Sequence, residues 1–258
     1  MTFIPNEDFK AKVLKGDVPG WSILRGFGER EGMGVPTNGC DVWRGNDSGV
    51  GGDDLIPLID SAGIQISVKS SSANDTSAGT GVRTIRLHYI KADGTEDSED
   101  LVMNGTTGVT TTDTDIVHVQ TLHALTVGSN TVAAGNITAY ATVGGDVYNL
   151  IALGGNMSMT MPRMVPAGHK LLVMGWDAEI SSNDRIAFRL RSTDDEGVLI
   201  EGVFLFKDAA YMAKSNSGQL QALFTAPAFS IVKVSAWPDQ TGGECSASWW
   251  GYLVADGS

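Results

Sequence analysis

Hydrophobic side chains recur at every second position along most of this chain of 258 residues. Ile64, Ile66 and Val68 alternate with polar residues, and the segment 83–89 repeats the pattern. A period of two is typical of a β-strand that buries one face. No long amphipathic helical pattern interrupts these segments, so the chain is predicted to form antiparallel sandwiches or jelly rolls and not a parallel α/β sheet.

Short glycine-bearing turns separate the expected strands. The pair 93-DG-94 stands in hairpin position, and 144-GGD-146 separates two further strand patterns. Beyond the two segments above, strands are expected at 97–103, 115–127, 135–143, 147–153, 169–176, 185–191, 198–207, 230–237 and 245–255.

We therefore predict an all-β protein with two antiparallel β-sandwich or jelly-roll-like domains, at 56–155 and 156–258. Residues 1–55 are predicted to form an extended, Gly-rich N-terminal arm, because no period is sustained there. Within it, a short helix is expected over 6–16, with Asn6 as its cap. Deleting residues 1–52 is then expected to leave soluble β-protein, because this segment has no core pattern of its own.

Charge and cysteine content narrow the function classes. The chain has 18 Lys and Arg against 30 Asp and Glu, a net charge of −12, which argues against nucleic acid as a partner. Cys40 and Cys245 are too few for a disulfide framework, so two free thiols are expected. Neither a signal peptide nor an apolar stretch of about 18 residues is evident, so we expect no membrane contact and synthesis in the cytosol.

None of the motifs that carry enzymatic or cofactor chemistry is complete. The segment 26-GFGEREG-32 lacks the spacing of a dinucleotide loop, and 79-GTG-81 lacks the lysine of a phosphate loop. The four histidines are scattered, and the acidic runs 93–100 and 193–197 lack the ligand order of a calcium loop. We therefore assign no catalytic residue, cofactor or metal.

A row of arginines is unusual in so acidic a chain. Alternation on the expected strand 185–191 places Arg185, Arg189 and Arg191 on the face opposite the hydrophobic residues. This row is either a solvated face or a contact with an acidic neighbouring subunit, because guanidinium groups pair well with carboxylates at interfaces. The three arginines are candidate subunit-interface residues.

Aromatic residues gather near the C-terminus. Alternation puts Trp249 and Trp250 on opposite faces of their strand, so at least one of them belongs to the core. Trp250 and Tyr252 are candidate exposed aromatics for stacking on a sugar.

The segment 67-SVKSSSANDTSAGTGVRTIRLHYIKADGTEDSEDLVMNGTT-107 resembles one that recurs in virion structural proteins of tailed bacteriophages. The shared blocks are a Ser-rich run, Asn-Asp-Thr, Gly-Thr-Gly, a strand, an Asp-Gly hairpin, an acidic strand and a closing Asn-Gly-Thr. The elements 38-NGCDVW-43 and 165-VPAGHK-170 are similar to that group as well. Capsid decoration or cement proteins are the members that the chain resembles most.

The resemblance implies a non-enzymatic particle component on the capsid exterior, made in the host cytoplasm. Residues 1–55 are then expected to anchor it to the shell or to a neighbouring protomer, so that deleting residues 1–52 abolishes attachment to the particle. Its implied partners are the major capsid protein and copies of itself in a homotrimer. The alternative is a tail, baseplate or fibre-associated protein with a receptor- or glycan-binding β-domain. An enzyme such as a polysaccharide depolymerase ranks last, because only an unordered supply of carboxylates favours it.

Overall fold

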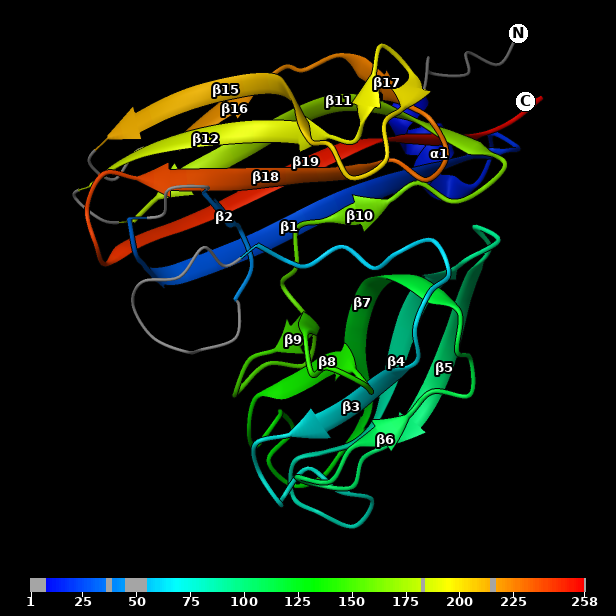
Figure 1. Cartoon of the computed structure of the whole chain (residues 1–258), viewed down its shortest axis with the longest axis vertical. Coiled ribbons are helices and arrows are strands. Elements are labelled where there is room, and N and C mark those ends of the chain that lie inside the picture. The colour runs from blue at the N-terminus through cyan, green and yellow to red at the C-terminus, as the bar shows by residue number, and fades with distance from the viewer. Residues whose placement is uncertain (1–7, 36–38, 45–54, 182–183, 214–216, 258) are drawn as a thin grey trace, which may run out of the picture.

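The protein is nearly all β (Figure 1) in the computed structural model, which describes residues 8–35, 39–44, 55–181, 184–213 and 217–257. The described part of the chain contains one helix, α1 (Phe9–Lys15). Asp8 caps it by accepting the backbone N–H of Lys10, and Gly16 ends it in the left-handed conformation. The short helix is therefore confirmed, although the predicted cap Asn6 lies outside the described residues.

Two sheets form the larger sandwich, which we call the jelly roll. The first, sheet A, runs in the order β1 (Trp21–Met33), β19 (Gly243–Ala255), β11 (His169–Ile180), β16 (Ser217–Leu220), with β17 (Phe224–Ala226) also on β11. The second, sheet B, runs in the order β10 (Arg163–Met164), β18 (Ile231–Pro238), β12 (Arg185–Ser192), β15 (Leu205–Ala213), with β2 (Cys40–Asp41) also on β18.

The strand order identifies the jelly roll. Taken along the chain, its main strands are β1, β2, β11, β12, β15, β16, β18 and β19. In sheet A the first pairs with the eighth, the eighth with the third and the third with the sixth, while sheet B joins the second, seventh, fourth and fifth. Two interlocked Greek keys of eight strands have this order.

An edge strand of sheet B is made in two pieces, with a second domain inserted between them. β2 pairs with β18 at Asp41 and Ser235, and β10 pairs with the same edge at Arg163 and Val232. Both pieces run antiparallel to β18 and follow one another along it. The chain therefore leaves the jelly roll and re-enters it at nearly the same point.

The inserted domain is a smaller sandwich (Figure 1, cyan to green). One sheet runs β6 (Val109–Thr110), β3 (Ile66–Ser70), β8 (Ile137–Ala141), β9 (Val147–Ile151), and the other runs β5 (Glu96–Val102), β4 (Val82–Lys91), β7 (Ile116–Val127). The predicted hairpin at Asp93 and Gly94 joins β4 to β5. Gly144 and Gly145 join β8 to β9, each with a positive φ.

Each sandwich has its own hydrophobic core. Trp176, Phe188 and Trp249 are the largest fully buried side chains of the jelly roll, while Ile85 and Leu87 are buried in the inserted domain. Alternation along these strands therefore predicts burial correctly. The remaining small hairpin consists of β13 (Asp194–Asp195) and β14 (Val198–Leu199).

A third hydrophobic cluster joins the two sandwiches. Val117 from the inserted domain packs with Met164 and Ile231 from the jelly roll. The Gln120 side chain bonds both backbone groups of Met164, donating to the carbonyl at 2.8 Å and accepting from the N–H at 3.1 Å. These contacts fix the inserted domain against the jelly roll.

The predicted N-terminal arm is wrong for the residues that form β1 and β2. β1 pairs with β19 over its whole length, and Cys40 belongs to the jelly-roll core. Gly26 and Gly28 lie where a Cβ would collide with the carbonyl oxygens of Met161 and Val42. These glycines therefore permit a close crossing of chain segments and are not a sign of an extended arm.

Cys40 and Cys245 are both free and buried, and each thiol contacts the sulfur of Met33. Burial raises the pKa of the Cys40 thiol to about 11, which makes it unreactive at neutral pH. Among the described residues, no helix is long and apolar enough to cross a membrane.

Candidate interaction face

The outward face of sheet B carries the arginine row. Ile186, Phe188 and Leu190 of β12 point into the core, so the arginines point outward, as the alternation predicts. Arg185 is exposed and Arg189 is half-buried. The three arginines differ in exposure, because each has different neighbours in the folded protein.

Arg189 lies among aromatic rings contributed by the two neighbouring strands. Its guanidinium carbon is 4.2 Å from the ring centroid of Trp237 on β18 and 4.6 Å from that of Phe206 on β15. The two rings themselves meet edge to face, with centroids 6.4 Å apart. Arg189 is thereby held in one orientation by stacking.

These residues continue into strongly exposed aromatic surface. Phe206 is 58% exposed and Tyr211, also on β15, is 81% exposed. We call Arg185, Arg189, Phe206, Tyr211 and Trp237 the Arg-aromatic face. Arginine, tyrosine and tryptophan are the residue types enriched at protein interfaces and at their energetic centres.

Arg191 has a different place, because it is buried inside the protein with 9% exposure. Its guanidinium bonds the hydroxyl of Ser235 and lies 3.5 Å from a carboxylate oxygen of Asp41. Arg191 is therefore paired within the chain and is not an exposed contact for another subunit. Sequence alternation misses this because Asp41 comes from β2, which is distant in the chain.

Asp41 is the centre of a buried charge network at the domain insertion. Its carboxylate accepts the Lys233 ammonium and the Ser235 hydroxyl, both at 2.8 Å, and the backbone N–H of Ile56 at 3.0 Å. Burial lowers the pKa of Lys233 and Arg191, and the Asp41 charge opposes this shift in both. Because Ile56 belongs to the linker that enters the inserted domain, the network fixes this linker to sheet B.

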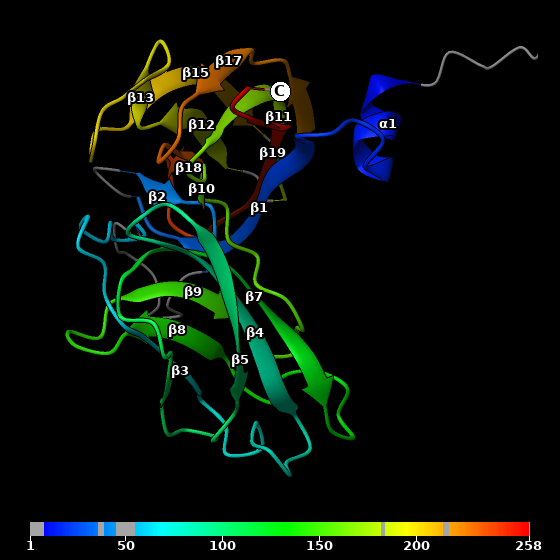
Figure 2. The ribbon, with the colours of Figure 1, turned by 90° about the vertical axis from the view of Figure 1, so that its right-hand side faces the viewer.

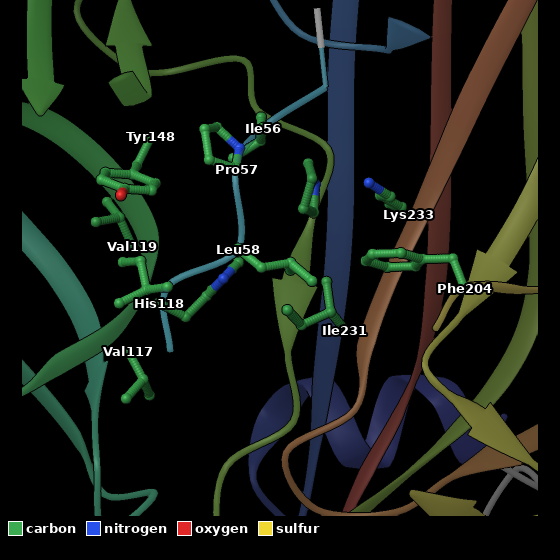
Figure 3. Close-up of a pocket in the computed structure, with 12 residues that line it drawn as sticks. Ile56, Pro57, Leu58, Val117, His118, Val119, Tyr148, Phe204, Ile231 and Lys233 are labelled. Atoms are coloured by element: carbon green, nitrogen blue, oxygen red, sulfur yellow. The ribbon is translucent and has the colours of Figure 1, made fainter. Parts of the chain in front are cut away.

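A small cavity lies beside this network, between the two domains (Figure 3). The linker residues Ile56 to Leu58 run along it, with His118 on one side and Lys233 and Phe204 on the other. Its volume of about 20 Å³ is close to the minimum for a single water molecule. The cavity is therefore too small for a substrate.

His118 faces this cavity and is kept neutral. Burial, followed by the positive charges of Arg163 and Lys233, lowers its pKa to about 3. Its Nε2 atom is buried and has no hydrogen-bond partner among the described residues. A histidine in this environment cannot carry a proton at neutral pH.

The aromatic residues near the C-terminus, like the arginines, differ from one another in burial. Trp249 is fully buried, which confirms that one member of the tryptophan pair is core. Tyr252 is only 8% exposed, so its prediction as an exposed residue is wrong. Phe9 of α1 and Trp21 of β1 cover it, since both meet its ring edge to face with centroids 5.4 and 5.8 Å away.

Trp250 stays half-buried beside them. The Lys10 ammonium of α1 lies 3.9 Å from the centroid of its ring and occupies one side of the indole. The two candidates therefore do not form an open platform on which a sugar ring could stack.

The polar stretch 70–81 is organised by a residue that sequence reasoning did not single out. Asp75 is fully buried, and its carboxylate accepts the Ser70 hydroxyl at 2.6 Å and the backbone N–H groups of Val82, Ala134 and Gly135 at 2.7 to 3.0 Å. Asp75 thus ties two loops of the inserted domain together. In the sequence, Asp75 is marked by its position within a run of serines and glycines. Ordinary turns contain the same pattern, so it does not identify a buried aspartate.

The side chains that could bind a metal ion are dispersed over the described ranges. No cluster of three or more His, Cys, Asp or Glu side chains that could hold a metal ion occurs there. Asp194, in one of the acidic runs, is buried and paired with Lys207 at 3.0 Å.

Comparison with known proteins gives no family. No family model matches the chain, and no curated protein matches it. Among solved structures, a chain from "Structure of infectious bursal disease virus Gx strain" is 12% identical with a TM-score of 0.28, covering 92% of this chain and 73% of that one. A chain from the Gt strain structure is 12% identical with a TM-score of 0.21, covering 97% and 78%. Similarities of this size assign neither fold nor function.

Proposed function

We propose that this protein is a non-enzymatic structural component of a bacteriophage particle, a decoration protein that binds the outer surface of the capsid. It stabilises the shell through multivalent contacts with the major capsid protein and with copies of itself in a homotrimer. The sequence resemblance to phage virion proteins suggests this role. The jelly roll is compatible with it, since capsid domains use that fold among others, but a fold alone does not define a function.

The observation that carries the proposal is the Arg-aromatic face. It exposes large aromatic side chains around an arginine that stacking holds in place, on a rigid sheet. Such a surface is costly to leave in water and is well suited to bind a protein that presents carboxylates and apolar groups.

Purified particles provide the first test. A copy number that matches the capsid subunits or their trimers, measured by quantitative mass spectrometry, supports the capsid location. A copy number equal to a single ring assigns the protein to the tail or baseplate, the alternative that the sequence leaves open. Absence from particles contradicts both.

A binding measurement tests the face itself. Tyr211→Ala is expected to weaken binding to capsids that lack this protein by about 30-fold, the effect of losing one central interface residue. Val143→Ser is the matched control, because Val143 is 89% exposed in the β8–β9 turn of the inserted domain. Equal binding by the Tyr211 variant and the wild type would remove the Arg-aromatic face from the proposal.

A further inference from the structure

A large groove lies at sheet A of the jelly roll, on the other side from the Arg-aromatic face of sheet B. It is bounded by α1, by β1 and β19 of sheet A, and by β4 and β7 of the inserted domain, and it has a volume of about 930 Å³. Figure 2 shows α1 standing out from the jelly roll on the same side as the face formed by β4 and β7. We call this the cationic groove.

Three cations line the groove, namely Lys10, Arg25 and Arg163. None of them lies within ion-pair distance of a carboxylate among the described residues, and Glu96 is the one acidic residue of the described lining. This concentration of unpaired positive charge contrasts with the chain's net charge of −12.

Arg163 is the most unusual of the three. It is 6% exposed, and its Nη1 donates to the carbonyl oxygens of Thr160 and Pro162 at 2.6 and 2.8 Å. Burial, followed by the charge of Arg25, lowers its pKa to about 10, so it stays charged at neutral pH. A buried guanidinium without a counter-ion is costly, and an incoming carboxylate would relieve that cost.

Apolar side chains are exposed beside these cations. Leu14 of α1 is 66% exposed, Phe27 of β1 is 44% exposed, and Met157, which precedes the return to the jelly roll, is 53% exposed. The groove thus offers positive charge and apolar surface together. The matching ligand is a protein segment that carries carboxylates next to aliphatic side chains.

The β13–β14 hairpin of this chain has that composition. Asp195 and Glu196 are exposed and form no ion pair with another described residue, while Val198 is 68% exposed and Leu199 is 36% exposed. The hairpin is held from within, because the buried Asp194 carboxylate accepts the Lys207 ammonium and the backbone N–H of Gly197. Its exposed side chains are therefore presented on a fixed support.

We propose that the cationic groove binds the β13–β14 hairpin of a second copy of this chain, with carboxylates against Arg25 and Arg163 and Val198 and Leu199 against the apolar side chains. The hairpin and α1 lie on opposite sides of the jelly roll in Figure 2, so the contact cannot form within one chain. This contact joins two different surfaces, the groove of one copy and the hairpin of the next. Repeated copies therefore close into a ring or extend as a filament. The contact specifies the self-association that the proposed function includes.

Charge reversal in the purified full-length chain tests this pairing. Arg25→Glu and Asp195→Lys change exposed residues on opposite sides of the proposed contact. Each is expected to weaken self-association about tenfold or more, measured by sedimentation equilibrium, because like charges then face each other. The double variant restores the pair with reversed signs and is expected to associate within a few-fold of the wild type. Lys170→Glu, an exposed change of β11 outside the groove lining, is the control and is expected to leave association unchanged.

The outcomes separate this contact from the proposed function. A wild-type chain that associates, loses association in both single variants and regains it in the double variant supports the pairing. A chain that stays monomeric up to millimolar concentration overturns it, as does association that neither reversal changes. A monomeric chain that binds an added acidic peptide through Arg25 would assign the groove to another protein's segment and also overturn it. None of these results depends on whether the protein is found in virions.

Discussion

Acid should destabilise this protein through His118, the neutral histidine between the two domains. In the unfolded chain its imidazole takes up a proton near pH 6.5, whereas in the folded protein its pKa is about 3. Between these values only the unfolded state binds the proton, so the free energy of unfolding falls as the pH falls. The contribution of the neutral His118 to the free energy of unfolding is therefore fully present above pH 6.5 and is lost as the pH falls toward 3.

The magnitude follows from the two pKa values. Each pH unit below 6.5 costs about 1.4 kcal/mol until the folded protein also binds the proton, so the loss attributable to His118 reaches about 3 kcal/mol at pH 4 and about 4 kcal/mol at pH 3. These figures are upper estimates, because water that enters the small cavity on protonation would reduce them. Even the smaller figure is a large fraction of the stability of an ordinary domain.

Urea unfolding of the wild type and of His118→Gln, followed by tryptophan fluorescence from pH 7.5 to pH 4, measures this contribution. Glutamine does not titrate, so the difference in unfolding free energy between the two proteins should change by about 3 kcal/mol across that range. Val143→Ser, an exposed change in the β8–β9 turn that removes no titratable group, is expected to keep the wild-type slope. Parallel pH profiles for the wild type and His118→Gln would refute the reasoning.

Three further changes test the insertion and the strands that hold it. Asp41→Ala leaves two buried cations without their counter-charge and should cost about 3–5 kcal/mol in urea unfolding, whereas Asp97→Ala, at an exposed ion pair of 3.9 Å, should change stability by less than about 0.5 kcal/mol. Gly28→Ala places a methyl group against the carbonyl of Val42 and should lower stability by about 1–3 kcal/mol, seen as a lower unfolding midpoint; an unchanged midpoint would mean that the crossing is loose. The sequence predicts that deletion of residues 1–52 leaves soluble protein, but the structure reverses this expectation, because the deletion removes β1 and β2 and should give insoluble protein; a soluble product with cooperative unfolding would contradict the role of β1.

Period-two alternation predicts most of this fold because burial on one face of a strand is a local signal. The strand at 185–191 and the burial of Trp249 follow from the sequence on this ground. Alternation does not predict β1. α1 covers part of its outer face, and glycines occupy inner positions where other chain segments cross. Neither face of β1 therefore shows the usual contrast between apolar and polar residues.

The interaction residues are harder to predict because their environment depends on distant segments. Arg189 and Arg191 are two positions apart and share a face, yet one lies on exposed aromatic rings and the other beneath Asp41, 150 residues away in the chain. Likewise, Tyr252 is hidden by a helix that begins at Phe9. Alternation predicts the face of the strand on which a side chain lies. Whether that side chain is exposed to solvent depends on tertiary packing.

The divided edge strand makes the inserted domain removable in principle. Val42 bonds β18 opposite Val234, and Arg163 pairs with Val232, so one position, opposite Lys233, separates the two pieces. Replacing residues 43–162 by a single threonine should restore a continuous edge strand, because neighbouring residues in a strand are about 3.3 Å apart. The jelly-roll core keeps its large aromatic residues in this variant but loses the buried Met161, and the apolar contact between the domains around Met164 is lost as well. We expect a β-rich protein that unfolds cooperatively at a lower temperature than the intact chain, measured by circular dichroism. A variant that shows no unfolding transition would mean that the inserted domain is needed to complete the jelly roll.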